Sequence, residues 1–188
     1  MNPIIINHFS RRKEFIQMLK ERGAKVGAEI GTDHGKYAQQ LCEGIPGLML
    51  FCIDPYVAYT EGTEVHNQEE VDQIFNAAHV RLEPYECIFR KVTSMEAAKD
   101  ALDNNLDFVF IDGNHEFEHC YEDIVEWTKK VKPGGIIAGH DYKVDPTRKY
   151  GVIEAVQKYT KENNISPWFI LHAGGKLVDC WMFIKPSA

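Results

Sequence analysis

The sequence lacks any apolar run of membrane-spanning length, since no stretch approaches the roughly 18 residues that a transmembrane helix needs. It also lacks the layout of a signal peptide, although Ile4-Ile5-Ile6 lies near the N-terminus. No internal repeat and no low-complexity linker interrupts the chain. We therefore expect a cytoplasmic protein that does not act on membranes.

Paired cysteine motifs are missing as well. The five cysteines are an odd number, they are widely spaced, and no CxxC pair occurs among them. This usage is typical of reduced, mostly buried thiols in a cytosolic protein, and it excludes a small disulfide-stabilised scaffold.

Basic residues are also fewer than acidic residues. The chain has 21 Lys and Arg against 28 Asp and Glu, which gives a formal net charge of −7. Neutralising the phosphates of a nucleic acid needs clustered Lys and Arg, so we expect no nucleic-acid partner.

What the chain does contain suits an ordinary globular protein. Its 188 residues are 44% hydrophobic and 26% charged, enough to bury a core without disulfides or a structural metal. Length alone favours one domain over residues 1–188. The sequence does not fix the oligomeric state, and a homo-oligomer is compatible with it.

Apolar runs alternate with amphipathic segments along the chain, which predicts βαβ units with right-handed crossovers. We therefore expect an α/β fold: a Rossmann-like three-layer sandwich whose mainly parallel sheet has seven strands and a C-terminal antiparallel hairpin. Gly174-Gly175 favours a tight turn in that hairpin. The expected strands are 25–30, 48–53, 86–92, 108–111, the run after Pro133-Gly134-Gly135, 168–172 and 177–184, and the expected helices are 10–21, 34–42, 68–82, 94–102, 116–130 and 152–162, with residues 57–67 read as a loop.

Two of these apolar runs end in an acid. Phe108 to Ile111 is followed by Asp112 and, three residues later, by His115, and the next run ends in His140-Asp141. Adjacent strands lie about 4.8 Å apart, so these side chains can converge on one ligand if both strands are parallel. Ligands bind outside the carboxyl ends of parallel strands, so this pair of strand ends predicts the active site.

The first of the expected strands leads into a glycine-containing turn, Gly27-Ala28-Glu29-Ile30-Gly31-Thr32-Asp33-His34-Gly35. Glycines let the backbone turn sharply and approach a ligand closely. The spacing is not GxGxxG, and Glu29 and Asp33 would repel a phosphate placed at the start of the next helix. S-adenosylmethionine carries a sulfonium and an ammonium group, so this turn favours that cofactor. The alternative is a purely structural strand-to-helix turn.

Two further strand ends are candidates for the same ligand. Asp54 ends the second predicted strand, where an acid can accept hydrogen bonds from ribose hydroxyls; alternatively it forms an Asp-Pro turn or a helix cap. Ser94-Met95 follows the third predicted strand and can border an adenine, or Ser94 can serve as a helix N-cap with Glu96 in the first turn.

With these motifs in place, the chain resembles the class I S-adenosylmethionine-dependent methyltransferases, in particular small bacterial enzymes related to macrocin O-methyltransferase. The likeness lies in residues 26–38, Asp54, the segment 110–123 and the segment 131–142, and it extends over nearly the whole chain. It implies that Glu29 and Gly31 hold the methionine portion of the cofactor, that Asp54 holds the ribose, and that Asp112 faces the transferred methyl group. The expected cofactor-binding residues are Glu29, Gly31, Asp33, Gly35, Asp54, Ser94, Met95 and Asp112.

In metal-dependent members of this family, acids at the ends of the fourth and fifth strands hold a divalent cation. Asp112 and Asp141 match those positions, and His140 stands where a second acid is common, so the implied metal ligands are Asp112, His140 and Asp141. Because imidazole suits softer ions than Mg²⁺, we leave Mg²⁺ and another divalent metal open. The catalytic candidates are Asp112, with His115 or His140 as the general base; the alternative for His140 is a supporting role.

The resemblance implies methyl transfer from S-adenosylmethionine to a hydroxyl of a small molecule, such as a sugar or a natural-product intermediate. Two other functions stay open. His115-Glu116-Phe117-Glu118-His119 matches the HExxH pattern of zinc hydrolases, in which both histidines share one helix face. A non-catalytic module that binds the cofactor is the other alternative.

Overall fold

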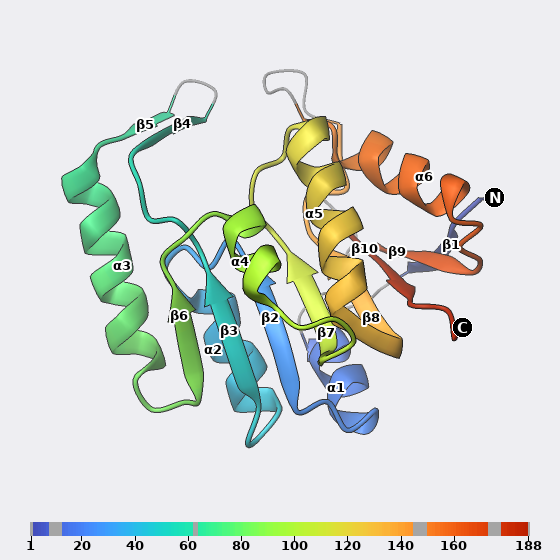
Figure 1. The fold of residues 1–188 in the computed structure, drawn as a ribbon, viewed down its shortest axis with the longest axis horizontal. Coiled ribbons are helices and arrows are strands. Elements are labelled where there is room, and N and C mark those ends of the chain that lie inside the picture. The colour runs from blue at the N-terminus through green and yellow to red at the C-terminus, as the bar shows by residue number, and fades with distance from the viewer. Residues whose placement is uncertain (1, 8–12, 62–63, 145–149, 173–177, 188) are drawn as a thin grey trace.

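A computed structural model describes residues 2–7, 13–61, 64–144, 150–172 and 178–187 (Figure 1). Strands and helices alternate through most of the chain, as the sequence predicts. The strands are β1 (Ile4–Asn7), β2 (Val26–Ile30), β3 (Met49–Ile53), β4 (Tyr59–Glu61), β5 (Glu64–His66), β6 (Cys87–Arg90), β7 (Leu106–Ile111), β8 (Val131–Gly139), β9 (Trp168–His172) and β10 (Cys180–Ile184). The helices are α1 (Lys13–Glu21), α2 (Lys36–Gly44), α3 (Gln68–Leu82), α4 (Ser94–Asp100), α5 (Phe117–Lys130) and α6 (Val152–Glu162).

The main sheet confirms the predicted Rossmann-like α/β class. Its order is β1-β9-β10-β8-β7-β2-β3-β6, and β10 pairs antiparallel with both of its neighbours, as predicted for the C-terminal hairpin. The sheet has eight strands, one more than expected, because the N-terminal isoleucine run forms β1 and pairs in parallel with β9. The predicted Gly174-Gly175 turn lies outside the described residues.

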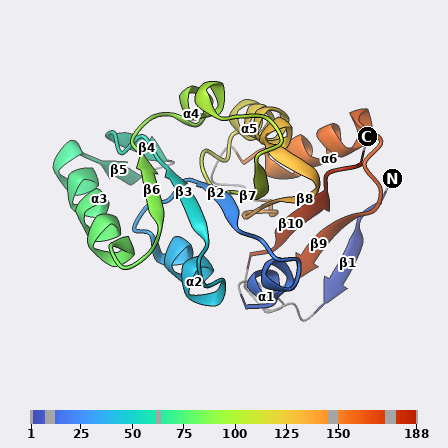
Figure 2. The same cartoon turned by 60° about the horizontal axis from the view of Figure 1, so that its bottom comes forward.

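Helices cover both faces of this sheet (Figures 1 and 2). One core cluster joins α1 and α2 to the sheet through side chains such as Phe15, Leu41 and Phe108. The other joins α4, α5 and α6 to the opposite face, and it contains Trp127 and Trp181. Burial of apolar side chains on both faces explains why the strands read as continuous apolar runs.

Two local predictions are corrected. Residues 57–67, predicted as a loop, contain the hairpin β4–β5, in which the rings of Tyr59 and His66 stack with centroids 4.7 Å apart. Helix α4 is capped by Thr93 rather than Ser94, because the Thr93 side chain accepts from the amide of Glu96 while the Glu96 carboxylate accepts from the amide of Thr93. Both features are short polar motifs that hydrophobic periodicity does not detect.

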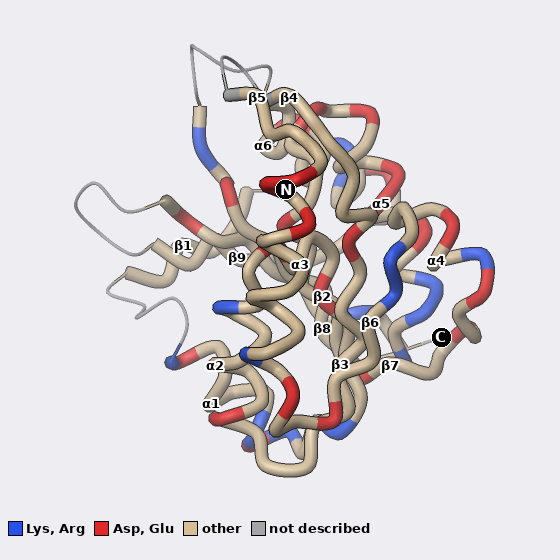
Figure 3. Tube along the Cα trace, turned by 90° about the vertical axis from the view of Figure 1, so that its left-hand side faces the viewer, with Lys and Arg blue, Asp and Glu red and all other residues tan. Residues whose placement is uncertain are grey.

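The order of the sheet determines where a ligand can sit. Strand β2 pairs in parallel with β3 on one side and β7 on the other, so the chain connections reverse direction between β2 and β7. A crevice at the carboxyl ends of the strands is expected at such a reversal. Basic and acidic positions are interspersed along the described chain (Figure 3), and none of its helices is long and apolar enough to cross a membrane.

Candidate functional site

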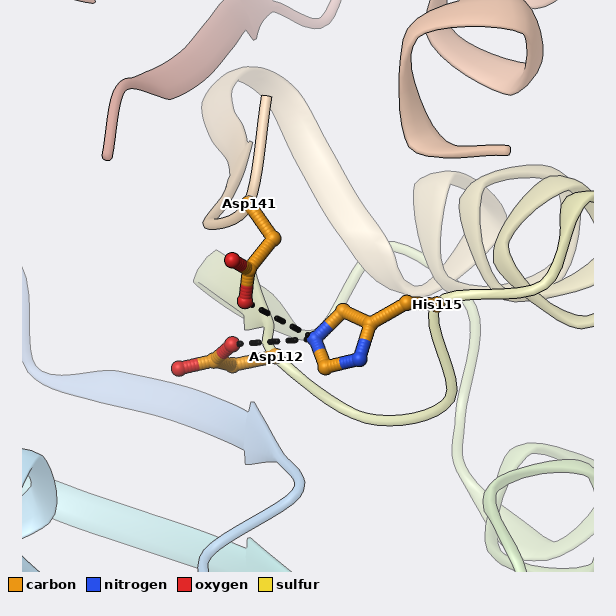
Figure 4. Close-up of side chains that lie close together, drawn as sticks. All are labelled: Asp112, His115 and Asp141. Atoms are coloured by element: carbon orange, nitrogen blue, oxygen red, sulfur yellow. Dashed lines mark ion pairs between the residues drawn. The ribbon is translucent and has the colours of Figure 1, made fainter. Parts of the chain in front are cut away.

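Two carboxylates and two imidazoles meet at the carboxyl ends of β7 and β8. His115 Nε2 lies 2.9 Å from Asp141 Oδ2 and 3.7 Å from Asp112 Oδ1 (Figure 4). His140 Nδ1 lies 3.1 Å from the same Asp141 oxygen and 3.6 Å from the same Asp112 oxygen. The convergence predicted from the two strand ends is thus present, and these four residues form what we call the carboxylate–histidine cluster.

Backbone contacts between neighbouring strand ends hold this cluster in place. The amide of Asp112 donates to the carbonyl of Ile30 at 2.8 Å, and the amide of His140 donates to the carbonyl of Ile111 at 3.1 Å. Asp141 has a φ of +53°, an uncommon conformation for a residue with a side chain. A glycine is required two residues earlier, at Gly139, because a Cβ there would lie 2.6 Å from the carbonyl oxygen of Ile111.

Electrostatics tie His115 to the two carboxylates. Burial alone would lower the pKa of His115, but its contacts with Asp112 and Asp141 outweigh burial and raise that pKa to about 10. Burial opposes ionisation of Asp141 as well, yet His115 and His140 hold the pKa of that carboxyl well below its usual range. At neutral pH the cluster therefore contains an imidazolium ion paired with an ionised carboxylate.

The cluster also has the donor set of a cation site. Asp112, His115 and Asp141 each offer one ligand atom, and these atoms lie within 4.8 Å of one another. His140, predicted as a ligand, contacts both carboxylates, while His115, predicted only as a base, joins the ligand group. Two carboxylates with an imidazole fit Mn²⁺, Fe²⁺ or Zn²⁺ better than Mg²⁺.

Gly31, at the end of β2, lies directly against the carboxylate–histidine cluster. It has a φ of +85°, and a Cβ there would lie 2.1 Å from the carbonyl oxygen of Asp112. Only glycine meets both requirements, so the predicted special role of this position rests on close strand-end packing. The glycine turn on β2 and the acid on β7 are consequently neighbours.

Glu29 is the buried acid of the glycine turn. It is 2% exposed, and its Oε2 has no hydrogen-bond partner among the described residues. Burial and the nearby Asp112 raise the pKa of Glu29 well above its usual value. A buried carboxyl without a basic partner is unfavourable by itself, and it fits a ligand that brings its own cationic group.

Asp54, at the end of β3, is linked to the glycine turn by backbone amides. Its Oδ2 accepts from the amide of Asp33 at 3.0 Å, and its Oδ1 accepts from the amide of Tyr56 at 2.9 Å. The Tyr56 hydroxyl in turn donates to the carbonyl of Asp33 at 2.9 Å. Burial nevertheless raises the pKa of Asp54. The Asp-Pro turn and the ribose site that the sequence left open are compatible with one another in this geometry.

The other predicted cofactor residues surround these two acids. Asp33 has a φ of +47° and pairs with His34 at 2.8 Å. Gly35 has a φ of +69° and precedes α2, with its amide donating to the carbonyl of Thr32 at 2.8 Å. Both positions thus shape the turn through the backbone.

Ser94 and Met95, both predicted to border the cofactor, begin α4. The hydroxyl of Ser94 donates to Asp123, and Trp127 Nε1 donates to that hydroxyl at 2.8 Å. Met95 is half-buried. The hydroxyl of Ser94 therefore attaches the start of α4 to α5.

Asp123 is a residue that sequence reasoning missed. It lies on α5, is 4% exposed, and has a pKa raised to about 6, chiefly by burial. A signal was available, because Asp123 lies between Cys120 and Trp127 on the apolar face of the predicted helix. An acid on such a face needs a partner, which here is Ser94.

The HExxH expectation is wrong in its geometry. Helix α5 begins at Phe117, so His115 lies in the preceding loop and Glu116 is the N-cap. His119 is exposed on the helix, while His115 lies against Asp112 and Asp141. The two histidines do not share a helix face, and the zinc-hydrolase alternative loses the arrangement it requires.

Comparisons with known proteins agree with this geometry. Residues 28–142, which include the carboxylate–histidine cluster and all but the first residue of the glycine turn, match a family described as methyltransferase domain. The fold is similar to that of the O-methyltransferase TomG from Streptomyces achromogenes, involved in tomaymycin synthesis and solved with S-adenosylmethionine: TM-score 0.65, 14% identity, 92% of this chain and 78% of that one. An O-methyltransferase from Bacillus cereus, solved with S-adenosylhomocysteine, gives a TM-score of 0.65 at 15% identity, over 96% of this chain and 84% of that one. No curated protein gives a significant sequence match.

Proposed function

Because this chain belongs to the methyltransferase domain family, we propose that it is a class I S-adenosylmethionine-dependent methyltransferase that methylates a hydroxyl group of a small molecule. The observation that carries this proposal is the carboxylate–histidine cluster, because it places proton-accepting groups next to the glycine turn of the cofactor side. Our proposal includes kinship with the small bacterial enzymes related to macrocin O-methyltransferase, and a sugar or natural-product intermediate as the acceptor.

The cofactor half of the proposal follows from the acids of β2 and β3. Glu29 is buried and has no hydrogen-bond partner at Oε2 within the described part of the chain, so it suits the ammonium group of the methionine portion. Asp54 keeps acceptor capacity beyond its two amide contacts and suits the ribose hydroxyls. Asp33, Gly35, Ser94 and Met95 complete the proposed cofactor site.

The chemistry is an in-line displacement. The acceptor oxygen forms a bond to the methyl carbon while the carbon–sulfur bond breaks, and the electron pair of that bond goes to sulfur to give S-adenosylhomocysteine. The hydroxyl proton must go to a base. His115, with a pKa near 10, is already protonated at neutral pH, so we assign the proton to His140 Nε2. Asp141 supports this role by accepting from His140 Nδ1 at 3.1 Å, which favours the tautomer with an accepting Nε2.

A divalent cation is a second, separable part of the proposal. Asp112, His115 and Asp141 would hold it. Such an ion supplies Lewis-acid polarisation, which lowers the pKa of an acceptor hydroxyl and orients it. We expect EDTA to lower activity and Asp141→Ala to abolish metal binding measured by calorimetry. Unchanged activity in EDTA together with unchanged metal binding in the variant would reject this part alone.

Cofactor binding and turnover test the main proposal in sequence. Isothermal titration with S-adenosylhomocysteine is expected to give a micromolar or tighter Kd, and no binding would contradict the proposal. Turnover is then measured as methyl incorporation from labelled S-adenosylmethionine into a panel of sugars and phenols. Binding without turnover on any hydroxyl acceptor would favour the non-catalytic module.

Two histidine variants then locate the base on an accepted substrate. His140→Gln is expected to lower kcat by about 100-fold or more, as for loss of a general base, with an unchanged Kd for S-adenosylhomocysteine. His115→Gln, a matched control in the same cluster, should instead change metal affinity. A larger loss of kcat in His115→Gln than in His140→Gln would instead identify His115 as the general base and His140 as the metal ligand.

A further inference from the structure

Lys143 is a cationic side chain beside the carboxylate–histidine cluster that the sequence did not single out. Its Nζ lies 3.2 Å from Asp141 Oδ1, while the other oxygen of Asp141 faces His115 and His140. Both oxygens of this carboxylate are therefore engaged by protein groups. A cation held by Asp112, His115 and Asp141 would approach Asp141 at Oδ2, the oxygen that faces His115, and would repel the ammonium group on Oδ1.

The backbone keeps Lys143 within reach of Asp141. The amide of Lys143 donates to the carbonyl of Asp141 at 2.7 Å, closing a tight turn centred on Tyr142, directly after the positive φ of Asp141. The side chain of Lys143 is 32% exposed, so its ammonium group stays in contact with water. A displaced ammonium group can therefore be rehydrated with little movement of the chain.

Tyr150 provides a second contact for the same ammonium group. Lys143 Nζ lies 4.9 Å from the centre of the Tyr150 ring, a distance at which a cation is attracted to the face of an aromatic ring. The Tyr150 ring stacks on His115 with centroids 4.6 Å apart, and the amide of Gly151 donates to the carbonyl of His115 at 2.8 Å. The ring is thus fixed beside the cluster, where it can keep the ammonium group after it leaves Asp141.

We propose that Lys143 is an internal cation that competes with a divalent metal ion for Asp141 and thereby weakens metal binding at the carboxylate–histidine cluster. This inference rests on the metal part of the proposed function. Lys143 is a positioning residue here: it holds the Asp141 carboxylate in place when no ion is bound. It moves toward Tyr150 when one binds, which makes loading of the site an exchange of cations.

The test is calorimetric titration of Mn²⁺ into protein freed of metal by a chelator, with S-adenosylhomocysteine present. Lys143→Met keeps the length of the side chain and removes its charge. We expect it to tighten the Kd for Mn²⁺ about tenfold, because it removes a positive charge that repels the ion and competes for the same carboxylate. Lys143→Arg keeps the charge and should leave the Kd unchanged or weaker.

Lys158→Met is the matched control. Lys158 lies on α6 with its Nζ 4.1 Å from the centre of the Tyr121 ring, so this variant removes a lysine with a similar aromatic contact. We expect its Kd for Mn²⁺ to equal that of the wild type. Thermal unfolding in EDTA gives a readout without metal: Lys143→Met should lower Tm more than Lys158→Met, because it leaves Asp141 Oδ1 without its ammonium partner.

The outcomes separate this inference from the metal proposal. If the wild type binds Mn²⁺ and Lys143→Met binds it equally or more weakly, the competition is overturned while the metal site stands. If Lys143→Met binds Mn²⁺ and the wild type does not, the competition is supported in its strongest form. If neither protein binds Mn²⁺, both the metal site and the competition fail.

Discussion

The carboxyl-end edge of the sheet has two halves, which we name by their proposed roles: the cofactor half at the ends of β2 and β3, and the acceptor half at the ends of β7 and β8. The acids of the two halves have opposite electrostatic surroundings. On the cofactor half, Glu29 and Asp54 are buried, their described hydrogen-bond contacts are with neutral groups, and burial raises the pKa of both. On the acceptor half, Asp141 is paired with His115, His140 and Lys143, and its pKa is lowered. Both halves contain carboxylates at strand ends, and only their neighbours differ.

This difference indicates which half is better suited to bind a cationic ligand. A carboxyl whose pKa is raised by burial becomes more favourable when a ligand brings a positive charge, as S-adenosylmethionine does. A carboxylate already paired with imidazolium and ammonium groups gains less from a further cation. The acids of the cofactor half are therefore suited to bind charge, and those of the acceptor half to hold histidines in position.

The largest effect is expected where the two halves touch. Gly31→Ala places a Cβ 2.1 Å from the carbonyl oxygen of Asp112 at a φ of +85°. Overpacking and the left-handed conformation together should lower the free energy of unfolding by about 4 kcal/mol. Binding of S-adenosylhomocysteine should be lost in whatever protein folds. Urea denaturation and calorimetry measure the two effects.

Gly47→Ala serves as the control for Gly31→Ala. Gly47 has a φ of +75°, but a Cβ there meets nothing within 4 Å. It should therefore show only the conformational term of about 1 kcal/mol and normal binding. Equal losses in the two variants would mean that backbone conformation, and not contact between the halves, explains the glycine.

Asp141→Asn breaks the pairing of the acceptor half. Because it removes the charged partner of His115, we expect a loss of about 3 kcal/mol in stability near neutral pH. The raised pKa of His115 contributes stability that is complete below pH 6.5 and is lost as pH rises through about 10. The lowered pKa of Asp141 contributes stability that is complete above pH 3.8 and is lost in acid. Within the accessible range, the variant and the wild type should therefore converge as pH rises through about 10, while the loss on the acid side needs strongly acidic conditions.

Urea denaturation of both proteins from pH 3 to pH 10 measures this difference. A stability difference that stays constant across that range would show that the aspartate contributes through packing and not through charge.

Glu29→Gln removes a carboxylate from the cofactor half. Unlike Asp141→Asn, it is not expected to lower the stability of the protein without ligand. We expect a Kd for S-adenosylhomocysteine weaker by about tenfold, from loss of a charge-assisted hydrogen bond to the ammonium group. The apo protein should be as stable as the wild type or more stable, because burial disfavours the ionised carboxyl. Calorimetry and urea denaturation at pH 8 check the pair of results. A destabilised apo protein would indicate that Glu29 has a cationic partner within the chain.

The sequence predicted both halves of the sheet edge, because the order of residues along the chain shows where strands end and which acids follow them. Asp112 and Asp141 were expected to converge, and the structure brings them together through parallel pairing of β7 and β8. The glycine turn was also recognised, although its reason is contact between Gly31 and Asp112, which depends on the register of β2 and β7. Alternation of apolar and polar segments therefore gives the sheet edge but not the contacts across it.

Side-chain pairing within the site was less predictable. The competition of His115 and His140 for one oxygen of Asp141, and the approach of Lys143 to the other, depend on backbone angles such as the positive φ of Asp141. The β4–β5 hairpin and the Thr93 cap were missed because short polar motifs carry no hydrophobic period. Ser94 was placed correctly at the start of α4, but its partner Asp123 comes from another helix.

Asp123→Asn gives the smallest effect and tests whether Asp123 belongs with the isolated acids of the cofactor half. Its pKa, raised from 3.8 to about 6 chiefly by burial, means that stability falls as pH rises through that interval. Asn keeps an oxygen for the Ser94 hydroxyl but has no charge to bury. We expect the variant to match the wild type at pH 4 and to be more stable by about 1 kcal/mol at pH 8. Its Kd for S-adenosylhomocysteine should stay within about threefold of the wild type, since a change of that size is below 1 kcal/mol. Urea denaturation at the two pH values measures the difference, and a loss of stability at pH 8 would place Asp123 with the paired acids of the acceptor half.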